Sequence, residues 1–122
     1  MFTHIMVGAN DVEESKKFYD AALGALGLPA GVMDPKGRCF YMTDGGVFAL
    51  TKPIDGGEAT AANGGTIGFA ASSPEAADAF HKAGLENGGV AIEDPPGDRG
   101  GMYIAYLRDP SGNKICALHR MG

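Results

Sequence analysis

The stretch FTHIMVGANDVEESKKFYDAAL, residues 2–23, recurs in pattern as GGTIGFAASSPEAADAFHKAGL, residues 64–85. The two align without a gap, so that Phe18 falls on Phe80. Each copy opens with a short apolar or alternating run, which is typical of a β-strand, and continues into a segment with helical spacing of its apolar side chains. A repeat at about half the chain length indicates one supersecondary unit written twice.

The remainder of each half predicts three shorter strands after the helix, which gives a β-α-β-β-β order in both. The first helix is expected to begin at an Asn10 cap. Ser72 and Glu75 repeat its spacing in the second half, but Pro74 fits best at the first helical position, which makes Ser73 the cap there. Turn residues at 44–46 and 109–112 predict hairpins. The strands are expected at 2–7, near 32, at 38–43 and 47–51 in the first half, and at 66–71, 90–93, 102–108 and 114–119 in the second.

The composition is that of an ordinary globular domain. A chain of 122 residues can bury a single core, and a net charge of −5 argues against a nucleic-acid partner. No apolar run approaches the ~20 residues of a membrane span, and no signal sequence precedes the first strand, so we expect a cytoplasmic protein without a membrane partner. Cys39 and Cys116 are expected to be free thiols. We expect one α+β domain over residues 1–122, with module 1 at about 1–55, a linker at 56–64 and module 2 at about 65–122.

Alternation along a strand assigns its side chains to two faces. If the bulky Ile5 and Ile67 pack beneath the helices, a second set faces the other way. Two curved sheets related by a pseudo-twofold axis would then enclose a cavity lined by that second set. Its members are His4, Met6, Thr66 and Gly68, together with Cys116 on the last strand.

The opening and closing segments are similar to those of a known family. The opening match comprises residues 2–5, 10–12, 15, 18–19 and 26–27, and the closing match is YLRDPSGNKI at 106–115. On these residues the chain resembles the glyoxalase/bleomycin-resistance/dioxygenase (vicinal oxygen chelate) superfamily over nearly its whole length. The resemblance implies two βαβββ modules in tandem forming curved mixed sheets around a cavity, and a homodimer. Members include glyoxalase I-type lyases, extradiol dioxygenases and metal-free proteins that sequester antibiotics.

The resemblance also implies a divalent metal, Zn, Ni, Fe or Mn, held by His, Glu or Gln on the first and last strands of each half. His4 occupies the first such position, but its counterpart in the second half is Thr66, and Cys116 stands where the last strand usually has Glu. Phe48, Ala49 and Leu50 offer no ligand. A catalytic metal normally needs about three protein ligands, so the set predicts a degenerate metal site of His4 and Cys116, with no cofactor assigned beyond it.

His4 is the candidate catalytic residue, because an imidazole exchanges protons near neutral pH. The alternative is a strand histidine satisfied by hydrogen bonds. Cys116 is either a nucleophile activated by His4 or a small buried hydrophobic side chain. The loop around Arg99 is either a plain connection or a lid whose arginine anchors an anionic ligand. The cavity is expected to be lined by Met6, Phe48, Thr66, Gly68, Tyr103 and Cys116.

Two functions follow from these expectations. The first is a glyoxalase-like protein that holds a small oxygenated organic molecule, as a lactoylglutathione lyase- or dioxygenase-type enzyme with a degenerate metal site. The second is a metal-free small-molecule binding or sequestering protein of the bleomycin-resistance type. For both functions we expect the protein to bind a small-molecule ligand and to form a homodimer.

Overall fold

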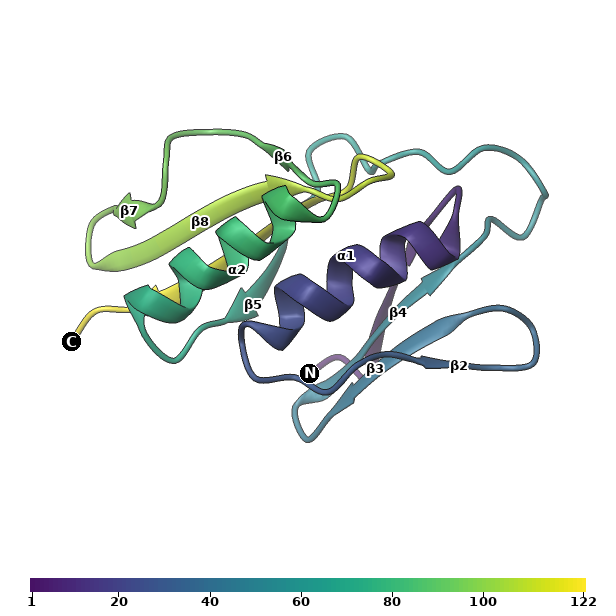
Figure 1. The fold of residues 1–122 in the computed structure, drawn as a ribbon, viewed down its shortest axis with the longest axis horizontal. Helices are drawn as coiled ribbons and strands as arrows, with labels where there is room; N and C mark the ends of the chain where they lie inside the picture. The colour runs from purple at the N-terminus through teal and green to yellow at the C-terminus, as the bar shows by residue number, and fades with distance from the viewer.

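The computed structural model describes all residues, 1–122. Two helices run across the middle of the molecule, each associated with its own sheet (Figure 1). The first half contains β1 (His4–Gly8), α1 (Val12–Gly24), β2 (Val32–Met33), β3 (Cys39–Thr43) and β4 (Gly46–Thr51). The second half contains β5 (Ile67–Ala70), α2 (Pro74–Glu86), β6 (Val90–Ala91), β7 (Gly97–Asp98), β8 (Met102–Arg108) and β9 (Lys114–Arg120).

The two sheets have the same topology, which confirms the predicted α+β fold of two tandem βαβββ modules. Sheet A has the strand order β1-β4-β3-β2, and sheet B has the order β5-β9-β8-β6. In both, the first strand pairs in parallel with the last, and the last pairs antiparallel with the strand before it. The short strand β7, which lies in the predicted loop around Arg99, was not predicted and pairs with β8.

One of the two predicted helix caps is wrong. Asp11, not Asn10, caps α1 by accepting a hydrogen bond from the backbone N–H of Glu14. Asn10 instead accepts the backbone N–H of Ala59, at 2.6 Å, and so attaches the inter-module linker to module 1. The cap of α2 is the predicted Ser73, with Pro74 in the first turn. Neither helix is long and apolar enough to span a lipid bilayer.

The two modules share one hydrophobic core. Helix α1 packs against α2, and the buried cluster takes side chains from both halves of the chain. Phe48 of β4 meets Phe69 of β5 edge to face, with ring centroids 5.1 Å apart. Neither module therefore buries its apolar surface without the other.

A buried polar network joins the modules at the segment DPSGN, residues 109–113. The carboxylate of Asp109 is 2% exposed and accepts hydrogen bonds from the Tyr19 hydroxyl at 2.6 Å and from the Asn113 side-chain amide at 2.9 Å. The same amide donates to the backbone carbonyl of Gly8. Ser111 accepts the backbone N–H of Asn10. We call these contacts the inter-module network.

Each sheet has one face toward the helices and one away from them, which we call the free face. The helix-facing set includes Leu50, Leu107 and Ile115, all fully buried. Side chains alternate between the two faces along each strand, so the residues on either side of these lie on the free face. The free face of sheet A carries His4, Met6, Phe40, Met42, Val47 and Ala49, and that of sheet B carries Gly68, Ala70, Ile104, Tyr106, Cys116 and Leu118.

Candidate functional site

A cavity of about 500 Å³ lies between the β1 and β4 side of sheet A and the edge strand β5 of sheet B. Ten of its sixteen lining residues are hydrophobic, and none has a carboxylate, an ammonium or a thiol in its side chain. This volume falls within the range of small-molecule sites, which are mostly apolar with a few placed polar groups. The lining comprises Met1, Phe2, Thr3, His4, Ile5, Leu28, Tyr41, Thr43, Gly45, Gly46, Val47, Phe48, Ile67, Gly68, Phe69 and Ala70.

His4 has the one basic side chain in the lining. It lies at the start of the edge strand β1 and is exposed. Its Nδ1 forms a 2.8 Å hydrogen bond with the Thr3 hydroxyl, which is the ring's one hydrogen bond. Because Nδ1 is engaged, Nε2 is the nitrogen available to a ligand. The histidine is therefore neither satisfied on both nitrogens nor coupled to a carboxylate that would orient it as a catalytic base.

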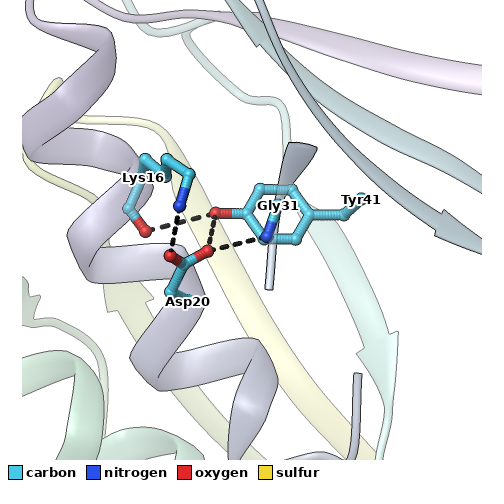
Figure 2. Close-up of polar contacts among 4 residues, drawn as sticks. All are labelled: Lys16, Asp20, Gly31 and Tyr41. Carbon is cyan, nitrogen blue, oxygen red and sulfur yellow. Dashed lines mark hydrogen bonds and ion pairs between the residues drawn. The ribbon is translucent and has the colours of Figure 1, made fainter. Parts of the chain in front are cut away.

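The aromatic wall of the cavity is fixed by one carboxylate (Figure 2). The Tyr41 ring lines the cavity, and its hydroxyl donates to Asp20 Oδ1 at 2.8 Å. The backbone N–H of Gly31 donates to the same oxygen at 2.9 Å, and Lys16 Nζ lies 2.7 Å from Oδ2. Leu28, three residues before Gly31, also lines the cavity. Asp20 thus fastens two walls, the β3 strand and the loop after α1.

The charges of this cluster are set by these contacts. Burial alone would raise the pKa of Asp20, but hydrogen bonds from Lys16, Gly31 and Tyr41 outweigh it, so that the pKa is lowered. The pKa of Tyr41 is raised, first by burial and then by its bond to Asp20. Tyr41 therefore remains a neutral donor to Asp20, and its hydroxyl is committed to holding the wall.

The structure brings only three of the sequence-predicted site residues together. His4, Phe48 and Gly68 line the cavity. Thr66 precedes β5 and is exposed. Tyr103 lies on the helix-facing side of β8, where its hydroxyl donates to Asp78 of α2. Two further residues, Met6 and Cys116, lie on the free face outside the cavity lining.

The residues present do not fit the divalent metal that the family resemblance implies. No three His, Cys, Asp or Glu side chains come together anywhere in the chain. On the free face of sheet A, register places Val47 and Ala49 beside His4 and Met6, and on that of sheet B it places Gly68 beside Cys116. Each module therefore offers one ligand, and a hard ion would find almost no oxygen donors. Burial raises the pKa of the Cys116 thiol, which favours the neutral form.

Several cavity residues were not predicted from the sequence. Phe69 and Ile67 were assigned to the core because they have the parity of helix-facing residues, yet they line the cavity where β5 is an unpaired edge. Phe2 has the parity of His4 in the strand expected at 2–7 but was not named as a lining residue, and Leu28 comes from a loop, where periodicity gives no signal. The Arg99 guanidinium donates to the backbone carbonyls of its own loop and of β8, so it fastens that loop to sheet B.

The tandem modules and the cavity at their junction define the class of the protein. The sequence matches the model of the glyoxalase/bleomycin resistance protein/dioxygenase superfamily over residues 1–117. A glyoxalase/bleomycin resistance protein from Albidiferax ferrireducens T118 is 61% identical, with a TM-score of 0.95 over 98% of both chains. The chain belongs to this superfamily.

More distant structures share the fold. A glyoxalase-related enzyme from Fulvimarina pelagi is 17% identical, with a TM-score of 0.79 over 98% of this chain and 88% of that one. A hypothetical protein from S. aureus is 20% identical, with a TM-score of 0.75 over 98% and 92%. No curated protein matches the sequence.

Proposed function

We propose that this protein is a metal-independent binder of a small, largely aromatic molecule. The observation that carries the proposal is the composition of the cavity, which is apolar and aromatic with a single imidazole and no second metal ligand. Flat apolar ligands stack against the rings of the lining that are accessible, Phe2 and Phe69, while Tyr41 and Phe48 lie buried behind them. An oxygen on the ligand accepts or donates a hydrogen bond at His4 Nε2.

A lyase or dioxygenase of the kind found in this superfamily is the weaker candidate. In such an enzyme His4 would be the base that removes a proton next to a carbonyl. No carboxylate lies in the cavity to orient or assist it, and the Tyr41 hydroxyl is bonded to Asp20. Binding requires only the groups that the cavity has.

The proposal includes a homodimer formed through the free face of sheet A. Register also places Val32 of β2 on this face, opposite Phe40. Val32 and Met42 are each 62% exposed, and Met6 is 38% exposed. Exposed apolar side chains gathered on one face mark a protein interface more often than open surface. Light scattering at several concentrations should give twice the chain mass, and a Met42→Lys variant should shift it toward the monomer. A wild-type monomer at all concentrations would refute this part.

The cavity is tested by measuring the binding of a fluorescent probe before and after a larger side chain is placed in it. N-phenylnaphthylamine is a neutral aromatic probe whose fluorescence rises in apolar sites, and we expect it to bind the wild-type protein. In Gly68→Leu the new side chain would reach the cavity, and a Cβ at this position meets its nearest atom, Cys116 Sγ, at an ordinary 3.4 Å. We expect binding to weaken at least about tenfold in this variant, the loss typical of blocked apolar contacts. The matched control is Gly24→Leu, because Gly24 lies in open space at the end of α1.

The role of His4 is tested with a pair of ligands. His4→Ala should weaken binding of naphthol relative to naphthalene by about two- to tenfold, the value of one hydrogen bond. Equal affinities of the Gly68→Leu and Gly24→Leu variants would refute the cavity. Stoichiometric Zn, Ni, Fe or Mn in the purified protein, lost in His4→Ala, would refute metal independence.

A further inference from the structure

The basic side chains of this acidic protein are unevenly distributed. Lys and Arg number 10 against 15 Asp and Glu, yet β5, β8 and β9 contain no acidic residue, although Glu93, Asp94 and Asp98 lie between β6 and β8. Three of the four arginines lie on β8, on β9 or in the loop beside them. They are Arg99, Arg108 and Arg120.

Register brings two of these cations together on the free face of sheet B. Arg108 of β8 is the cross-strand partner of Lys114 of β9. Like charges directly opposite one another in a sheet repel, so this pairing destabilises the sheet unless an anion lies near it. Tyr106, two residues before Arg108, is on the same face. Lys114 Nζ lies 4.9 Å from the centroid of the Tyr106 ring, and Arg99 Cζ lies 5.4 Å from it. We call Arg99, Tyr106, Arg108 and Lys114 the basic corner.

The positive charge of the basic corner is only partly neutralised. Glu93 pairs with Lys114, and it is the one residue other than glycine with a left-handed backbone, at φ 61°. The arginines have no carboxylate partner. Arg108 donates to the carbonyl of Gly112, and Arg99 to carbonyls of its own loop and β8. The site thus has a surplus of cations and one acidic group in the position that a ligand's anion would take.

We propose that the basic corner binds the anionic group of a small organic ligand, such as a carboxylate, sulfonate or phosphate. Lys114 and Arg108 attract the charge, and Tyr106 supports an adjoining aromatic or aliphatic part. The Glu93 carboxylate competes for Lys114 and is displaced when the ligand binds.

The free face connects this site to the cavity. Register aligns Gly68, Cys116 and Tyr106 in one row across β5, β9 and β8. Gly68 lines the cavity, and adjacent strands are about 4.8 Å apart, so the row spans about 10 Å. A molecule with an apolar body in the cavity therefore reaches the basic corner with an acidic group. This inference rests on the proposed function and narrows its ligand to an amphipathic anion.

Two matched probes separate the anion from the apolar body. Anilinonaphthalene sulfonate carries the anilinonaphthalene framework of N-phenylnaphthylamine and adds one sulfonate. Lys114→Gln should weaken the sulfonate probe by roughly three- to fivefold, the scale of one exposed charge, and leave the neutral probe unchanged. Glu93→Gln should strengthen the sulfonate probe, because the competing carboxylate is gone. Added salt should weaken only the sulfonate probe.

The control is Lys82→Gln, which removes an exposed cation from α2, away from sheet B's free face. It should change neither probe. An unchanged ratio of the two affinities in both Lys114→Gln and Glu93→Gln would overturn the proposal even if the neutral probe binds. If the sulfonate probe binds in a way that depends on Lys114 but the neutral probe does not bind, the proposed cavity is refuted and the anion site is supported. Failure of both probes to bind would overturn both.

Discussion

Gly31 has no room for a side chain, because its backbone lies directly on Cys39 and Tyr41. A Cβ there would lie 2.4 Å from Cys39 Sγ and 2.7 Å from Tyr41 Cζ. The side chains of Cys39 and Tyr41 are both fully buried. The close approach lets the Gly31 N–H reach Asp20. One glycine thus decides whether the loop after α1 can form a wall of the cavity.

We expect Gly31→Ala to lower the free energy of unfolding by about 1–3 kcal/mol, the usual cost of overpacking. Gly24→Ala should instead raise it by up to about 1 kcal/mol, because Gly24 is helical with nothing within 4 Å of a Cβ. Urea denaturation of the two variants measures both. A Gly31→Ala variant as stable as Gly24→Ala would contradict the close packing.

Strand parity was the most informative residue-level signal in the sequence. It predicted that His4, Met6 and Gly68 lie on the face away from the helices. It did not predict which of them reach the cavity, because that depends on how two separate sheets approach each other. Asn10 and Asp11 are both good caps, and only the contact of Asn10 with Ala59 decides between them.

At the scale of elements, Asp20 connects three of them. It lies on α1, and it holds β3 through Tyr41 and the following loop through Gly31. Because the folded pKa of Asp20 is lowered, its stabilising effect is complete above the unfolded value near 4. The effect is lost as the pH falls through the lower folded value.

We expect Asp20→Asn to lower the melting temperature most above about pH 5, and the difference from the wild type to shrink as the pH falls below about 4. Melting curves across this range provide the measurement. Asp44→Asn is the control, because Asp44 is exposed and its carboxylate forms no ion pair. A difference that stays constant with pH would show that the Asp20 charge does not hold these elements.

Element order was predictable because hairpin residues and helical spacing repeat in both halves. Strand β8 begins and ends at the predicted residues, 102 and 108, since turns bound it on both sides. The two-residue strand β7 was not predicted, because Gly97 and Asp98 have low strand propensity and pair with β8 only through tertiary contact.

At the scale of the whole molecule, the inter-module network makes the two halves interdependent. Tyr19 and Asp109 are 90 positions apart and both almost fully buried. Burial and the Asp109 charge raise the pKa of Tyr19 well above its usual value, so its hydroxyl stays a donor. A buried carboxylate without a cationic partner depends on each of its donors.

We expect Tyr19→Phe to lower the free energy of unfolding by about 1.5–3 kcal/mol, the cost of a lost hydrogen bond to a charged group. Tyr103→Phe removes a similar bond to Asp78 at the surface and should have a much smaller effect. Both variants should unfold in one transition by fluorescence and by circular dichroism. Equal effects of the two substitutions would contradict a special role for the network.

The closing signature YLRDPSGNKI was recognisable from the sequence, but its function in this chain was not. The signature suggested the family, whereas the contacts of Asp109 and Asn113 with module 1 depend on segments about a hundred residues away. The metal site illustrates the reverse case. The residue types alone predicted an incomplete set of metal ligands. In the structure, the strand beside His4 places the apolar residues Val47 and Ala49 next to it on the same face, where further ligands would be needed.

The inter-module network also has a consequence for synthesis. Asp109 leaves the ribosome 90 residues after Tyr19. At 5–20 residues per second, this interval is roughly 5–20 s. Helix α1 has no second helix against its aromatic side chains until α2 is made, and no closing segment until Asp109 is made. The nascent first half is therefore the stage at which chaperones would bind this chain, and slower translation would prolong it.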